Sequence, residues 1–146
     1  MSDVATTHIA TASLTVNAGP DQVWRALTDP DLVKDYFFGT TVTSDWQVGS
    51  TVTYAGEWDG QPYEDRGVVV EADPPLLLIT TFFSPASGKA DVPENHQRVT
   101  YRIQPIDGGC RVSVEQDNND SEDAAERSSS SWMTILEGLA TVAPSA

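Results

Sequence analysis

The stretch that most constrains the fold is the last one, residues 121–142, which has the pattern of a long amphipathic helix. Ser121 is a capping residue type, and Glu122 and Asp123 place negative charge at the helix start, where the backbone dipole favours it. A helix of this length needs a partner surface for its apolar face, so the rest of the chain must supply one. The apolar residues of that face follow the i, i+3, i+4, i+7 spacing: Trp132, Ile135, Leu136, Leu139 and Val142.

The segments before this helix have the alternating pattern of β-strands. Asp59-Gly60 is a strong signal for a two-residue hairpin turn. Val99, Tyr101 and Ile103 share one face of their strand, which is typical of an antiparallel sheet with one buried and one wet face. The expected strands cover residues 8–16, 40–46, 51–58, 63–72, 76–83, 97–104 and 110–116.

Two short helices are expected after the first strand. Pro20 opens the first helix, and Asp29-Pro30 ends it, because the residue before a proline avoids helical angles. The second helix covers residues 31–38. The predicted fold is therefore α+β, with a curved antiparallel sheet wrapped around the long C-terminal helix. Residues 1–8 are predicted to be a flexible tail, and residues 9–143 a single domain.

Composition limits the classes of partner. The net charge of -14 argues against nucleic acid as a partner. No apolar run is long enough to span a bilayer, so we expect no membrane insertion. Cys110 is the single cysteine and excludes an internal disulfide. Residues 1–4 lack the features of a secretion signal, and together these observations predict a cytoplasmic location.

The sequence contains no strong catalytic constellation. No serine or cysteine lies in a nucleophile-elbow context, no ligand spacing suggests a zinc site, and there is no glycine-rich phosphate loop. We therefore predict no catalytic residue, no metal and no cofactor. One acidic cluster, made of Glu57, Asp59, Glu64 and Asp65, flanks a hairpin tip and is most simply a solvated turn. If Glu57 or Asp65 points inward, it could serve as an acid or base with a raised pKa.

Several motifs resemble those of a known protein family. The most specific is the run Val23-Trp24-Arg25-Ala26-Leu27-Thr28-Asp29-Pro30. It is joined by the Gly49 turn after Trp46, and by two strands before a helix that contains Trp132. With these features the chain resembles the helix-grip superfamily, also called START-like, Bet v 1-like or SRPBCC. Within it, the chain is similar to the branch named for the C-terminal domain of the activator of heat-shock-protein-90 ATPase. The resemblance covers roughly residues 9–140.

The resemblance implies a cavity between the sheet and the C-terminal helix that holds a small apolar or amphipathic ligand. For each residue that could contact such a ligand, the alternative is that it belongs to the packed core. Tyr54, Tyr101, Trp58 and Trp132 are favoured for orienting a ligand, because their polar tips need partners when buried. The residues that could line the cavity are Trp24, Phe37, Tyr54, Trp58, Val69, Phe82, Tyr101, Trp132 and Leu136.

Three functions are compatible with this reading. The leading hypothesis is a non-catalytic module that binds a ligand in the cavity. The second is an enzyme of the cyclase, aromatase or hydrolase kind found elsewhere in the superfamily, which predicts an ionisable residue deep in the cavity. The third is a protein-interaction role, including chaperone regulation. Formation of a homodimer through a sheet edge stays open at this point.

Overall fold

The computed structural model describes residues 8–146, so the expected tail lies outside the described residues except for His8. The helices are α1 (Pro20–Thr28), α2 (Pro30–Tyr36) and α3 (Glu122–Val142), with short 3-10 turns at Pro85–Ser87, Pro93–Asn95 and Ala143–Ser145. The strands are β1 (Ala10–Val16), β2 (Thr41–Thr43), β3 (Thr51–Trp58), β4 (Gln61–Asp73), β5 (Leu77–Phe82), β6 (Gln97–Ile106) and β7 (Gly109–Gln116).

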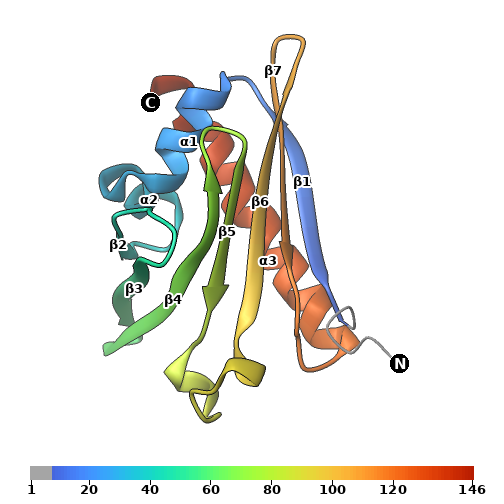
Figure 1. The fold of residues 1–146 in the computed structure, drawn as a ribbon. Helices are drawn as coiled ribbons and strands as arrows, with labels where there is room; N and C mark the ends of the chain where they lie inside the picture. The colour runs from blue at the N-terminus through green and yellow to red at the C-terminus, as the bar shows by residue number, and fades with distance from the viewer. Residues whose placement is uncertain (1–7) are drawn as a thin grey trace.

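The seven strands form one curved sheet in the order β1-β7-β6-β5-β4-β3-β2, and all neighbours run antiparallel. The long helix α3 crosses one face of this sheet, while α1 and α2 lie near the C-terminal end of α3 (Figure 1). This arrangement is the helix-grip fold, and it confirms the fold class predicted from the sequence.

The strand register sorts the side chains onto two faces. In the β6–β7 ladder, Tyr101 is opposite Val114 and Ile103 is opposite Val112. All four of these side chains are buried, whereas their sequence neighbours are more exposed. Because side chains alternate along a strand, every second residue faces α3 and forms the core.

Helix α3 begins and packs as its sequence predicts. The Ser121 hydroxyl accepts a hydrogen bond from the backbone N–H of Ala124 at 3.0 Å and so caps the first turn. Gly138 allows a close approach to α2, since a Cβ at this position would lie 2.6 Å from Cβ of Tyr36. Among the residues described, no helix is both long and apolar enough to cross a membrane.

Several predicted boundaries were wrong by one to three residues. Helix α2, expected over residues 31–38, is Pro30–Tyr36, and the strand expected to begin at residue 63 begins at Gln61. The strand expected over residues 40–46 is only Thr41–Thr43, because the Ser44 hydroxyl accepts a hydrogen bond from the Trp46 backbone N–H at 3.0 Å and the chain leaves the sheet. The turn between the last two strands consists of Asp107 and Gly108, and β6 and β7 extend up to it. Gly108 has a φ of +82°, which only glycine adopts readily.

Candidate functional site: a cavity between the sheet and α3

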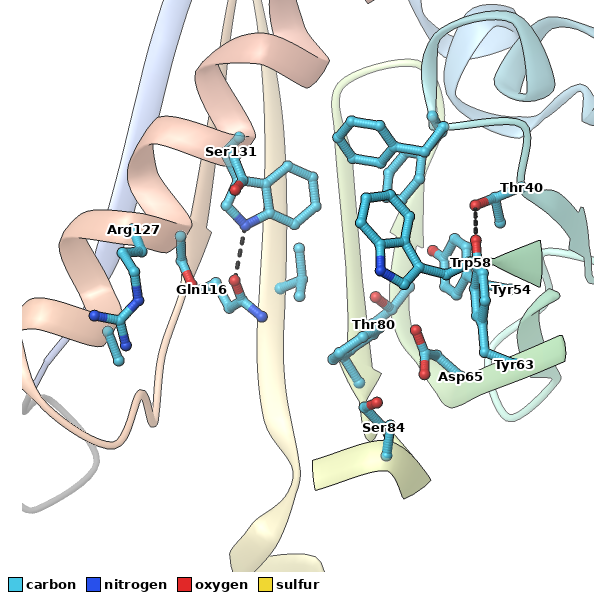
Figure 2. Close-up of a pocket in the computed structure, with 18 of the residues that line it drawn as sticks. Thr40, Tyr54, Trp58, Tyr63, Asp65, Thr80, Ser84, Gln116, Arg127 and Ser131 are labelled. Atoms are coloured by element: carbon cyan, nitrogen blue, oxygen red, sulfur yellow. Dashed lines mark hydrogen bonds between the residues drawn. The ribbon is translucent and has the colours of Figure 1, made fainter. Parts of the chain in front are cut away.

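A cavity of about 920 Å³ lies between the concave face of the sheet and helix α3. This volume is within the range of known small-molecule pockets, about 300–1,000 Å³. Its walls come from the segment after α2, from β3, β4, β5 and β6, from the end of β7, from the turn after β5, and from the first half of α3. Figure 2 shows these walls, with Arg127 and Ser131 on the helix side and Tyr54 and Asp65 on the sheet side.

Aromatic rings in mutual contact form the inner part of the cavity. Phe37 stacks on Tyr54 with ring centroids 5.7 Å apart, and its edge meets Trp132 at 6.1 Å. Tyr101 packs edge-to-face on Trp132 at 5.7 Å, and Tyr54 lies 6.3 Å from Phe82. Since aromatic pairs prefer such geometries, these contacts hold the walls in place without filling the space between them.

A chain of amide hydrogen bonds fixes the indole of Trp132. Its Nε1–H donates to Oε1 of Gln116 at 2.8 Å (Figure 2). Nε2 of Gln116 donates in turn to Oε1 of Gln97 at 2.7 Å. Across the cavity, the hydroxyls of Thr40 and Tyr63 are joined at 2.6 Å. The indole N–H of Trp132 is therefore already occupied, and Trp132 offers a ligand only its ring.

The hydroxyls of Tyr54 and Tyr101 differ from the Trp132 indole N–H in their hydrogen bonding. Both residues are buried, with 9% and 6% of their surface exposed. Apart from one another, the two hydroxyls have no hydrogen-bond partner among residues 8–146, and both residues line the cavity. Burial raises the pKa of Tyr54 to about 12, although the neighbouring Tyr101 hydroxyl acts in the opposite direction. Burial also raises the pKa of Tyr101, so both phenols stay protonated. One of the two hydroxyls donates to the other, which leaves one O–H of the pair free to donate to a ligand.

Two acidic side chains of the hairpin cluster line the cavity, Asp59 at its exposed rim and Asp65 on its wall. Asp65 is half-buried and lines the cavity wall, whereas Glu57 is exposed and does not line it. Burial raises the pKa of the Asp65 carboxyl, while the Ser84 hydroxyl beside it acts in the opposite direction. The inward orientation that the sequence left open is thus found for Asp65.

The structure brings six of the predicted ligand-site residues together around the cavity. They are Phe37, Tyr54, Trp58, Phe82, Tyr101 and Trp132. Three others do not line it. Val69 and Leu136 are each only 1% exposed and belong to the packed core, and Trp24 is half-buried on α1. Val69 and Leu136 are surrounded by other core side chains, and Trp24 packs against the core from α1.

The sequence reasoning missed several polar lining residues, including Thr80, Gln116 and Arg127. For two of these, the signal was present in the alternation of the strands. Thr80 lies two positions from Phe82 on β5, and Gln116 lies two positions after Val114 on β7, so each shares the inward face. No comparable signal marks Arg127, since its direction depends on how α3 sits on the sheet.

Comparisons with known proteins agree with this geometry. The family model described as "Activator of Hsp90 ATPase homolog 1-like protein" matches residues 17–143. The solved structure of ChR145 from Cytophaga hutchinsonii is 41% identical, with 91% of each chain covered and a TM-score of 0.80. No curated protein matches this chain in sequence.

Two more distant structures share the fold. CalU16 from Micromonospora echinospora is 21% identical, with 90% of this chain and 73% of that chain covered and a TM-score of 0.70. The Aha1 dimer from Colwellia psychrerythraea is 15% identical, with 93% and 96% covered and a TM-score of 0.72. On the family match and the 41% identical relative, this chain belongs to the family of Activator of Hsp90 ATPase homolog 1-like proteins.

Proposed function

We propose that this domain binds a small apolar or amphipathic molecule in the cavity between the sheet and α3. The observation that carries the proposal is a cavity of about 920 Å³ with a framework of aromatic rings and two inward phenol hydroxyls that lack other partners. Small-molecule sites are typically concave and mostly apolar, with a few placed polar groups. This space has the same features, and they favour occupation by a ligand.

The expected driving force is burial of apolar surface. At about 25 cal/mol per Å², a ligand that hides 200 Å² of apolar area would gain roughly 5 kcal/mol before the costs of immobilisation. The hydroxyl pair of Tyr54 and Tyr101 would then set the ligand's orientation, with its one free O–H donating to an oxygen or nitrogen acceptor. The aromatic walls and this donor would together select the size and polarity of the ligand.

A cavity-blocking variant tests the proposal. Ser131 lies on α3, is exposed to solvent and lines the cavity, so Ser131→Phe should fill space there without disturbing the core. Ser130 is its exposed neighbour and does not line the cavity, which makes Ser130→Phe the matched control. Titration with the neutral fluorescent probe N-phenyl-1-naphthylamine should show saturable binding to the wild type and to Ser130→Phe. Ser131→Phe should bind at least about tenfold more weakly.

A second candidate function is catalysis in the same cavity, and Asp65 is the observation that favours it. A half-buried carboxyl with a raised pKa inside an apolar cavity is suited to acid–base work. Its test is a substrate screen with product detection by mass spectrometry. Turnover that is abolished by Asp65→Asn, with binding retained, would support an enzyme; binding without product would support a carrier.

Assembly and location are also proposals. The Colwellia protein is described as a dimer, and we propose that this chain also forms a homodimer. Light scattering coupled to gel filtration would measure the mass directly. Interaction with a chaperone, which the family description raises, and a cytoplasmic location both stay predictions.

A further inference from the structure

Asp65 occupies an unusual place for a carboxylate. In the β3–β4 ladder it is directly opposite Tyr54, and the side chains of such a pair lie on the same face of a sheet. That face is the concave one, toward α3, and Asp65 lines the cavity there. Burial is the largest influence on its pKa, which means that the protein itself solvates the ionised form poorly.

No basic side chain in the described part of the chain neutralises Asp65. Its sequence neighbour Arg66 is directed to the other face, where it forms an ion pair with Asp91 and lies over the ring of Phe83 at 5.7 Å. Lys89 pairs with Asp120. Arg127 lines the cavity, but it is exposed on α3 and lies across from Asp65 (Figure 2).

Aromatic rings surround the same part of the cavity. Tyr54 is opposite Asp65 on β3, and Tyr63 precedes it by two positions on the same face of β4. Phe82 and Trp58 also line this cavity, and Trp58 is 74% exposed at the hairpin. An unneutralised carboxylate among aromatic faces is a favourable environment for an organic cation, because both the charge and the ring quadrupoles attract it.

We propose that the cavity selects an amphipathic ligand with a protonated amine, which Asp65 binds while the aromatic walls hold the apolar body. This inference rests on the proposed function and names the chemical class of its ligand. The net charge of -14 raises the concentration of cations near the molecule, which favours the same class. Arg127 disfavours a positive group at its own end of the cavity and thereby orients the amine toward Asp65.

Three naphthalene probes with one apolar body test the proposal. They are 1-naphthylmethylamine, which is positively charged at pH 7, 1-naphthylmethanol, which is neutral, and 1-naphthoate, which is negatively charged. Fluorescence titrations of the full-length protein should give a dissociation constant for the amine about tenfold lower than for the alcohol, the size expected of a charge-assisted hydrogen bond. The naphthoate should bind more weakly than either.

Asp65→Asn keeps the shape of the side chain and removes its charge, so the preference for the amine should fall to within about twofold of the alcohol. Glu57→Gln removes the same charge from an exposed position outside the cavity and should retain the full preference. An alcohol that binds wild type as tightly as the amine, or a preference that survives Asp65→Asn, would overturn the inference and leave the proposed function standing. If none of the three probes binds wild type, both fail together.

Discussion

Tyr54 on β3 and Asp65 on β4 are opposite each other in an antiparallel ladder, and both side chains line the cavity beneath α3. The tight turn at Asp59 and Gly60 fixes this pairing, because a two-residue loop makes Trp58 and Gln61 partners and sets every pair behind them. A phenol donor and a carboxyl acceptor are thereby presented to one space. The recognition chemistry of the cavity follows from the register of this hairpin.

Two tyrosines that differ in their partners should respond differently to loss of the hydroxyl. The Tyr36 hydroxyl donates to the Ala26 carbonyl oxygen at 2.6 Å, whereas the Tyr54 hydroxyl has only Tyr101 beside it. Tyr36→Phe should lower the free energy of unfolding by about 1 kcal/mol, and Tyr54→Phe by less than about 0.5 kcal/mol. Urea denaturation checks both values. An equal loss in the two variants would mean that Tyr54 has a structural partner in the protein.

Asp65→Asn should stabilise the ligand-free protein at neutral pH. Burial raises the pKa of Asp65 in the folded state above its ordinary value of 3.8. Below that value both the folded and unfolded states hold the proton and no penalty arises. As pH rises through 3.8 and then through the raised pKa, the folded state loses stability relative to the unfolded state.

The measurement is thermal unfolding of both proteins between pH 3 and pH 7. Asp65→Asn should raise the unfolding temperature only slightly at pH 3 and more strongly at pH 7. Glu57→Gln, which removes a charge from an exposed position, is the matched control. An advantage that is the same at both pH values would contradict a penalty caused by ionisation.

Gly138 should be intolerant of even one added carbon. A Cβ there would lie 2.6 Å from Cβ of Tyr36, so Gly138→Ala must displace α2 from α3. Overpacking of this kind typically costs about 1–3 kcal/mol, which exceeds the gain of about 1 kcal/mol in helix propensity. Ser130→Ala on the exposed face of the same helix should instead stabilise by a few tenths of a kcal/mol. Urea denaturation of the two variants should therefore give changes of opposite sign.

Trp132→Phe should destabilise the protein through Gln116. The substitution keeps an aromatic ring but removes the indole N–H that donates to Gln116 Oε1, leaving a buried acceptor without its partner. The expected loss is about 1–3 kcal/mol in the free energy of unfolding. A double-mutant cycle with Gln116→Met separates the energy of the lost hydrogen bond from the energy of the lost packing. A coupling energy near zero would contradict the account.

The fold could be predicted because its patterns are local. Alternation placed the strands, the Asp59-Gly60 turn placed the hairpin, and the apolar spacing of residues 121–142 placed α3 with its start one residue from Glu122. The short β2 could not be predicted, since Ser44 ends it through a hydrogen bond to the Trp46 backbone. The cavity depends on the distance between helix and sheet, which side-chain volumes alone do not determine. For this reason Leu136 and Val69 were expected to line the cavity and are packed core instead.

The measurement that tests the central claim most directly is native mass spectrometry of the protein purified gently from its own source organism. The account predicts an additional stoichiometric mass on the folded protein, which is released on denaturation and absent from Ser131→Phe. The Ser130→Phe control should retain it. A bare mass for the wild type under gentle conditions, together with no binding of the naphthalene probes or of N-phenyl-1-naphthylamine, would contradict a ligand-binding cavity.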